Sequence, residues 1–124
     1  MVFKVKMMDF WVSAIYRFLA IIFIPLKFMA PVRTGRITDT VSAIKTGAVN
    51  FYVYQKGGSC IALDSGVGGT SSKRSLGNLN IDADTVSAVF LSHSDFDHAG
   101  GVPLFPNAVI YISHEEEQLF TYFK

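Results

Sequence analysis

Cysteine is almost absent from this sequence, which holds only Cys60. A single cysteine excludes an intrachain disulfide, and it also excludes a Cys-x-x-Cys motif for metal binding or redox chemistry. Cys60 begins the apolar run 60–63, so we expect a buried thiol that packs as a small hydrophobic side chain.

An excess of charge of either sign is also lacking. The 11 lysine and arginine residues are balanced by 10 aspartate and glutamate residues, which gives a formal net charge of +1. Proteins that bind nucleic acid usually carry a strong positive balance or a basic cluster, and this sequence has neither. We therefore expect no nucleic-acid partner.

Hydrophobic residues are plentiful, and they concentrate in the N-terminal segment 1–32. Its stretch 10–30 is about long enough to cross the roughly 30 Å hydrocarbon core of a bilayer as a helix. Arg17 and Lys27 oppose this interpretation, because a charge at the centre of a span costs about 2.5–3.5 kcal/mol on insertion scales. Pro25 opposes it as well.

Three interpretations of this apolar N-terminal helix stay open. It is a membrane anchor, a helix that packs on the domain or on a partner, or a cleaved signal peptide with Lys4, Lys6 and Arg17 ahead of a short apolar core. We favour the anchor, which predicts a membrane-associated protein. Under the other two interpretations the protein is cytoplasmic or secreted.

Residues 33–124 are enough for one small domain and too few for two. Pro31 and Gly35 mark a linker over 31–36. Strands alternate with helices along the rest of the chain, so we expect an α/β domain with a mixed sheet. The expected strands cover 38–44, 50–54, 60–64, 86–91 and 108–112, and the expected helices cover 73–76 and 114–123.

Three of these elements carry local signals. Gly57 and Gly58 separate the strands 50–54 and 60–64, as in a β-hairpin. The apolar strand 86–91 is typical of a strand that is buried on both faces. Ser113 and Glu116 have the spacing of a capping box at the start of the last helix.

Four residues of metal-ligand type fall within the loop that follows strand 86–91, namely His93, Asp95, Asp97 and His98. In an extended loop, side chains two positions apart point to the same side, so this spacing can serve one or two metal ions. Imidazole and carboxylate suit Zn²⁺, and added carboxylates shift the preference toward Fe or Mn. Ala99, Gly100 and Gly101 are small enough for the backbone to turn tightly beside the site.

The loop resembles the His-x-His-x-Asp-His signature of the metallo-β-lactamase-fold hydrolases. The hairpin and the element Asp64-Ser65-Gly66 are similar to the opening of that fold. The resemblance covers roughly 37–123, and it implies the N-terminal half of an αβ/βα sandwich. It also implies that His93 binds a first metal and that Asp97 and His98 bind a second. Asp97 would in addition orient the attacking water, and Asp64 would lie beneath the site.

The sequence departs from the family in two respects. Asp95 stands where the family has its second histidine, and it is shorter and anionic. His114 comes too early to be the family's next histidine ligand, and the chain ends inside an expected helix, so a C-terminal half or a partner chain is needed to complete the site.

These observations leave two main hypotheses about function, and a third, weaker one of a small membrane protein whose loop binds a metal structurally. The first is a metal-dependent hydrolase, represented here by a fragment, that acts on a small-molecule ester, lactone, thioester, amide or phosphodiester. The alternative is a catalytically incomplete half-domain that acts as a binding or structural protein.

Overall fold

The computed structural model describes the backbone of residues 30–121 and the side chains of residues 30–118. The chain divides into two units between Ala30 and Pro31. The expected apolar helix in 1–32 therefore lies almost wholly outside the described residues, and its membrane role stays a prediction. Among the described residues, none of the helices has both the length and the apolar character that a bilayer span requires.

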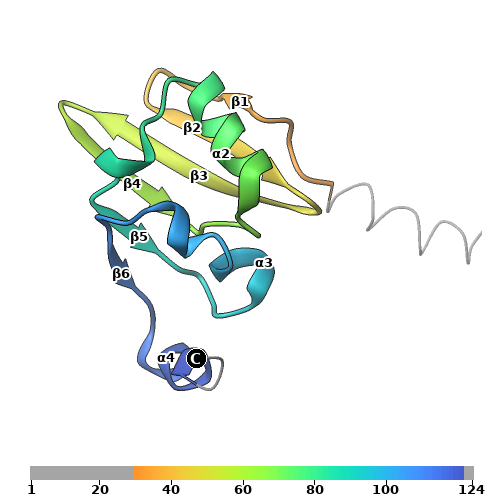
Figure 1. The fold of residues 1–124 in the computed structure, drawn as a ribbon, viewed down its shortest axis with the longest axis vertical. Coiled ribbons are helices and arrows are strands. Elements are labelled where there is room, and N and C mark those ends of the chain that lie inside the picture. The colour runs from red at the N-terminus through yellow and green to blue at the C-terminus, as the bar shows by residue number, and fades with distance from the viewer. Residues whose placement is uncertain (1–29, 122–124) are drawn as a thin grey trace, which may run out of the picture. The chain divides into compact units, whose positions relative to one another are not determined.

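One mixed sheet organises the second unit, and its strand order equals the chain order (Figure 1). The first four strands are antiparallel neighbours, whereas β5 is parallel to β4 and β6 is parallel to β5. An α/β domain with a mixed sheet is thereby confirmed. The strands are β1 Gly35–Arg36, β2 Val41–Thr46, β3 Val49–Lys56, β4 Ser59–Leu63, β5 Ala88–Phe90 and β6 Val109–Tyr111.

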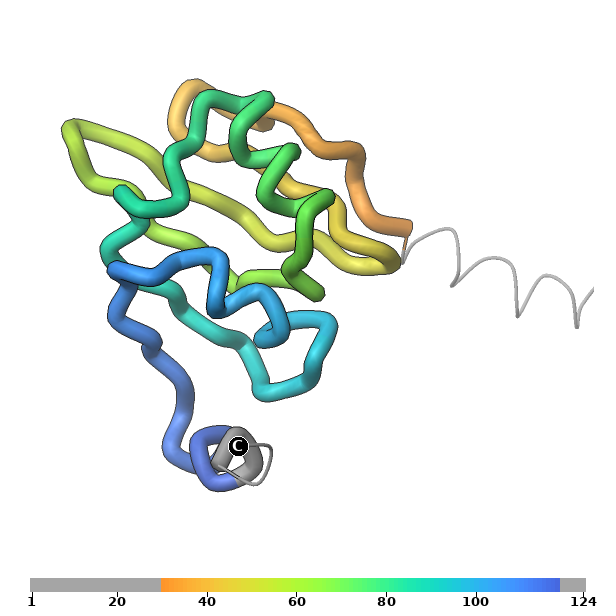
Figure 2. The backbone as a smooth tube through the Cα atoms, in the orientation of Figure 1, coloured from red at the N-terminus to blue at the C-terminus, as the bar shows by residue number. Residues whose placement is uncertain are grey.

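The helical segments connect the later strands. They are α2 Gly69–Asn78, the short 3₁₀ turns η1 Ala83–Thr85 and η2 Val102–Leu104, α3 Phe96–Ala99, and α4 His114–Thr121. The tube in Figure 2 shows the chain leaving β6 and ending in α4 beyond the sheet edge.

The expected hairpin is confirmed. β3 and β4 pair antiparallel from Tyr52 opposite Leu63 to Lys56 opposite Ser59. Gly57 and Gly58 have φ of 57° and 80°. A two-residue turn with two positive φ angles matches the right-handed twist of the strands, and glycine adopts it without steric cost.

The first strand was misplaced by the sequence pattern. It begins at Val41, not at residue 38, and it continues to Thr46. The Thr38 hydroxyl accepts hydrogen bonds from the backbone N–H groups of Thr40 and Val41, which holds a turn where strand was expected. The expected linker also contains a strand, because Gly35 and Arg36 pair with β2.

Two other elements differ in extent. The short helix expected over 73–76 is the ten-residue α2, whose Ser72 hydroxyl donates to the Gly68 carbonyl oxygen. The strand expected over 86–91 is confirmed as strand only for Ala88–Phe90.

The core lies on one face of the sheet. Phe51, Val53 and Val89 are almost fully buried there, and Leu76 of α2 and Ala99 of α3 belong to the same hydrophobic cluster. The opposite face is open in part, because Phe90 keeps 42% of its surface exposed. Burial of β5 on both faces was therefore a wrong expectation.

Candidate metal centre

Asp64 ties the end of β4 to the segment after β5. It directly follows β4, and its backbone N–H donates to the Phe90 carbonyl oxygen at 2.8 Å. Its φ of 59° is in the left-handed region, which Asp tolerates better than most residues. Its carboxylate accepts the Ser92 backbone N–H at 2.7 Å and the Ser92 hydroxyl at 2.9 Å. Two strand ends are thus joined directly below the histidine loop.

His98 is oriented by the same carboxylate. His98 lies on α3, and its Nδ1 is 2.8 Å from Asp64 Oδ2. An ionised carboxylate can only accept, so the proton of the neutral ring sits on Nδ1 and Nε2 keeps its lone pair. The backbone is fixed as well, because the His98 carbonyl oxygen accepts both the N–H and the hydroxyl of Ser65 at 2.8 Å each.

His93 is oriented through Ser92. Its Nδ1 is 2.8 Å from Ser92 Oγ, and the single proton of that hydroxyl points to Asp64. Ser92 Oγ must therefore accept from His93 Nδ1, which again leaves the Nε2 lone pair free. The two imidazole rings have centroids 4.0 Å apart. One carboxylate, directly and through one hydroxyl, gives both histidines the tautomer that a metal ion requires.

Asp97 completes a group that could hold a metal ion. Ligand atoms of His93, Asp97 and His98 all lie within 4.8 Å of one another. Asp97 is in the first turn of α3, and its Oδ2 is 3.7 Å from His98 Nε2. Two imidazole nitrogens with free lone pairs and one carboxylate are a donor set that fits a divalent transition-metal ion.

Asp95 lies beside this group rather than within it. Its Oδ2 is 3.6 Å from His93 Nε2, and its side chain is 77% exposed. It precedes the first residue of α3, where its side chain makes no capping hydrogen bond. The carboxylate is therefore not engaged by the helix, and its role as a ligand stays a prediction.

The small residues after His98 allow two backbone segments to touch. A Cβ on Gly101 would lie 2.0 Å from the Ser65 carbonyl oxygen, and one on Gly68 would lie 2.9 Å from the Gly101 Cα. The Gly101 N–H donates to the Gly66 carbonyl oxygen at 2.8 Å. This close approach packs α3, which carries Asp97 and His98, against the turn that follows Asp64.

Sequence reasoning missed two serines and misjudged one glutamate. Ser92 links His93 to Asp64, but a serine beside a histidine gives no signal of its own. Glu116 Oε2 accepts the Ser94 N–H at 2.8 Å and the Ser94 hydroxyl at 2.7 Å. These hydrogen bonds hold the pKa of Glu116 below its ordinary value. The Ser113-Glu116 spacing offered a local capping role instead, and that spacing obscured the contact with the loop.

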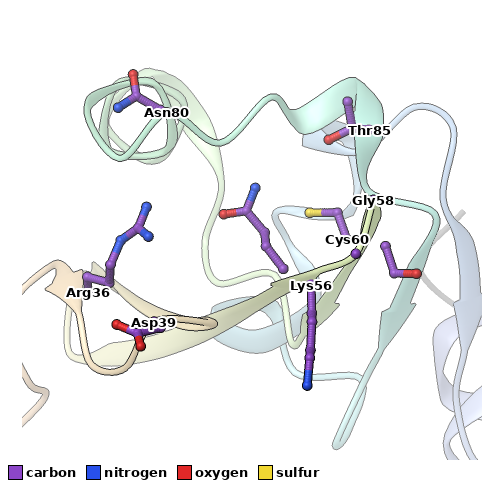
Figure 3. A pocket seen from close by; sticks show the side chains of 10 residues that line it. Arg36, Asp39, Lys56, Gly58, Cys60, Asn80 and Thr85 are labelled. Atoms are coloured by element: carbon purple, nitrogen blue, oxygen red, sulfur yellow. The ribbon is translucent and has the colours of Figure 1, made fainter.

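A separate hollow lies at the other end of the β3–β4 hairpin. Its volume is about 470 Å³, and its walls include Arg36, Asn80, Thr85 and Cys60. Figure 3 shows the Arg36 side chain reaching toward Asn80 across this hollow. Cys60 is 4% exposed, and burial raises the pKa of its thiol. No residue of the histidine loop lines the hollow, so it is not part of the candidate metal centre.

Comparison with known proteins agrees with this geometry. The model of the Metallo-beta-lactamase superfamily matches residues 44–124. A metallo-beta-lactamase from Cronobacter sakazakii has 21% identity and a TM-score of 0.64, over 73% of this chain and 34% of its own. The subclass B3 enzyme BJP-1 of Bradyrhizobium japonicum has 18% identity and a TM-score of 0.61, over 73% and 36%.

Some similar structures have a higher identity. One of these is AidC, described as a dizinc quorum-quenching lactonase, with 27% identity and a TM-score of 0.51 over 64% of this chain and 29% of its own. No curated protein matches the chain. The match covers about a third of the length of each of these solved structures, and this chain shares their fold over that part.

Proposed function

This chain belongs to the metallo-beta-lactamase superfamily, and from that membership we propose that it forms the first metal-binding half of a metal-dependent hydrolase. One observation carries the proposal: His93, Asp97 and His98 bring their ligand atoms within 4.8 Å of one another. Hydrogen bonds to Nδ1 of both histidines support it, because they leave Nε2 free to bind a metal.

Each loop residue has a proposed task. His93 and Asp95 hold a first metal, and Asp97 and His98 hold a second. Asp97 also orients the attacking water, and Asp64 fixes the ring of His98 from below. A divalent ion bound here supplies Lewis acidity, which polarises a carbonyl or phosphoryl oxygen and acidifies water.

The donor set supports Zn²⁺ as the resident ion, because neutral imidazole and carboxylate are among its usual ligands. Asp95 in place of a histidine adds a hard anionic oxygen, which raises the relative preference for Fe²⁺ or Mn²⁺. We propose one or two ions of these kinds.

The substrate class is a small molecule with a hydrolysable acyl or phosphoryl bond. Ester, lactone, thioester, amide and phosphodiester substrates all suit a metal-activated water. The likeness to the lactonase AidC supports a lactone as the first compound to test.

The open sheet face supports a further element of the proposal. Leu63, Phe90 and Tyr111 form a row across three neighbouring strands, and each keeps between 42% and 50% of its surface exposed. Contiguous apolar surface of this kind usually marks a contact with other protein. We propose that a C-terminal half or a partner chain covers this face and completes the metal site.

The test compares the 124-residue chain with a longer product of the same gene. Both are stripped of metal, reloaded with Zn²⁺, Mn²⁺ or Fe²⁺, and assayed for bound metal and for turnover of an ester, lactone and phosphodiester panel. We expect the longer protein to hold metal and to lose turnover on His98→Ala. The short chain should bind metal weakly and show no turnover, because ligands from one loop alone do not fix two ions.

Two results would contradict this proposal. A longer protein that binds no metal with its loop intact would favour the alternative, a half-domain with a binding or structural role. Strong turnover by the short chain that disappears in His98→Ala would show that no further half is needed.

A further inference from the structure

Glu116 directs its carboxylate away from its own helix. In a capping box, the glutamate side chain returns to the backbone N–H of the N-cap residue, here Ser113. Only half of that arrangement is present, because Ser113 Oγ accepts the Glu116 N–H at 3.3 Å. The Glu116 carboxylate instead accepts two hydrogen bonds from Ser94, at 2.8 and 2.7 Å. The partner of the Glu116 carboxylate is thus Ser94, which is 22 positions away in the sequence, and not the nearby Ser113.

Ser94 stands between two proposed ligand positions, His93 and Asp95. Its N–H belongs to the peptide group that joins it to His93. That group is planar and rigid, so an acceptor that holds the N–H also holds the backbone of His93. The Ser94 hydroxyl bond to the same oxygen restricts the residue further. Glu116 therefore holds the loop at Ser94, whereas Asp64 holds it at Ser92.

The chemistry of this contact suits a positioning role. The Ser94 hydrogen bonds lower the pKa of Glu116, so the group is ionised at neutral pH. Hydrogen bonds to an ionised acceptor are shorter and about twice as strong as neutral ones. Both bonds are partly buried, which limits competition from water.

We propose that Glu116 is a positioning residue of the metal centre, which holds the loop at Ser94 so that His93 and Asp95 meet a metal ion from fixed positions. The inference rests on the proposed function, since it assumes that the loop binds metal. Glu116 acts through Ser94, and it is not assigned to the group of ligands itself. The orientation of α4 is thereby coupled to the geometry of the centre.

The experiment uses the full chain and Co²⁺ as the probe. Glu116→Ala removes both hydrogen bonds, Ser94→Ala removes only the hydroxyl bond, and Glu116→Gln keeps an oxygen acceptor without the charge. Glu115→Gln is the matched control, because Glu115 lies in the same helical turn and is exposed. Three quantities are measured: the hydrogen-exchange rate of the Ser94 amide without metal, the affinity for Co²⁺, and its visible absorption spectrum.

For Glu116→Ala we expect Ser94 exchange to be roughly tenfold faster, as for loss of a hydrogen bond to a charged acceptor. Affinity for Co²⁺ should fall by about tenfold, the lower end of what is typical for groups that orient metal ligands. The Co²⁺ spectrum should change in shape. Glu116→Gln should recover part of these losses, Ser94→Ala should show a smaller loss, and Glu115→Gln should match the unmodified chain.

Unchanged Ser94 exchange and unchanged Co²⁺ binding in Glu116→Ala would overturn the inference. If Glu116→Ala does not fold, the milder Ser94→Ala and Glu116→Gln decide it by the same measurements. If neither the unmodified chain nor the longer protein binds Co²⁺, the proposed function fails. Ser94 exchange then decides separately whether Glu116 holds the loop.

Discussion

Asp64 shows how one side chain can set the chemistry of two others. Its carboxylate accepts from Ser92 and from His98, and Ser92 relays the effect to His93. The orientation of both histidines depends on the Asp64 carboxylate, because an ionised carboxylate accepts hydrogen bonds and donates none. Asp64 therefore decides which nitrogen of each histidine is available, although no metal needs to touch it.

Replacement of Asp64 by asparagine should disturb the histidines while preserving the backbone, since asparagine also tolerates a positive φ. One of the two carboxylate oxygens becomes an NH₂ donor, which must face either Ser92 or His98. When it faces His98, it favours the tautomer with a proton on Nε2. We expect metal affinity to fall by roughly 10–100-fold, together with a change in the His98 tautomer detected by ¹⁵N NMR.

The control for this prediction is Asp39→Asn, because Asp39 is an exposed aspartate outside the histidine loop. It should leave both the NMR signals and the metal affinity as they are. Full metal affinity in Asp64→Asn would mean that the histidines hold their orientation without the carboxylate.

The thiol of Cys60 should be inert in the folded chain. It is 4% exposed, and burial raises its pKa, so little thiolate forms at neutral pH. We expect a thiol reagent such as iodoacetamide to label the folded chain very slowly. After unfolding in guanidinium chloride, labelling should reach about one group per chain, the full cysteine content. Mass spectrometry measures both states, and rapid labelling of the folded chain would contradict the expectation.

At the scale of elements, the contact between α3 and the turn after β4 depends on the absence of a side chain. Gly101→Ala would place a Cβ 2.0 Å from the Ser65 carbonyl oxygen, and a backbone atom cannot move aside easily. We expect a loss of about 1–3 kcal/mol in the free energy of unfolding, as for other overpacked positions. Chemical denaturation measures this change.

Gly77→Ala is the matched control, because nothing lies within 4 Å of a Cβ there and Gly77 is within α2. The same substitution should raise the free energy of unfolding by about 0.5–1 kcal/mol, since alanine is the better helix former. Equal effects of the two substitutions would show that the close approach at Gly101 is not needed for stability.

The elements that sequence reasoning placed well are those with strong local signals. The hairpin follows from two glycines between β-rich segments, and β5 follows from its run of apolar residues. The start of β2 was placed wrongly because the turn at Thr38 arises from a side-chain hydrogen bond that competes with strand pairing. β1 was missed because two residues carry too little pattern to indicate a strand.

The candidate site was predictable only in part, because a sequence pattern indicates local spacing and not the packing of distant elements. His93, Asp97 and His98 fall within one short loop, so their spacing already indicates a metal site. Contacts such as Ser94 with Glu116 depend on how distant elements pack. Local spacing gives no information on such packing, and here it favoured another partner for Glu116.

At the scale of the whole molecule, the open sheet face should make the isolated chain self-associate. Leu63, Phe90 and Tyr111 lie side by side on it, and the rings of Phe90 and Tyr111 stack at 4.7 Å. The double substitution of Phe90 and Tyr111 by threonine keeps β propensity and removes much of the apolar surface. We expect it to shift the chain markedly toward monomer, as measured by analytical ultracentrifugation.

Ile37→Thr serves as the control, because Ile37 is 55% exposed and lies outside these strands. It should leave self-association unchanged. At roughly 100 µM, a contact with a dissociation constant in the low micromolar range is mostly formed. If the unmodified chain is still monomeric at this concentration, the result would argue against this face as a contact surface.

The agreement between strand order and chain order has a consequence for how the chain is made. Each strand pairs with the one synthesised just before it, so no strand has to wait for a distant partner to emerge from the ribosome. Contacts that are local in sequence close quickly, and the N-terminal part of the chain is the first to emerge during synthesis. The antiparallel strands β1–β4 can form first and offer β4 as a template for β5. The histidine loop then takes shape between β5 and β6, after Asp64, which orients its histidines, is already in place.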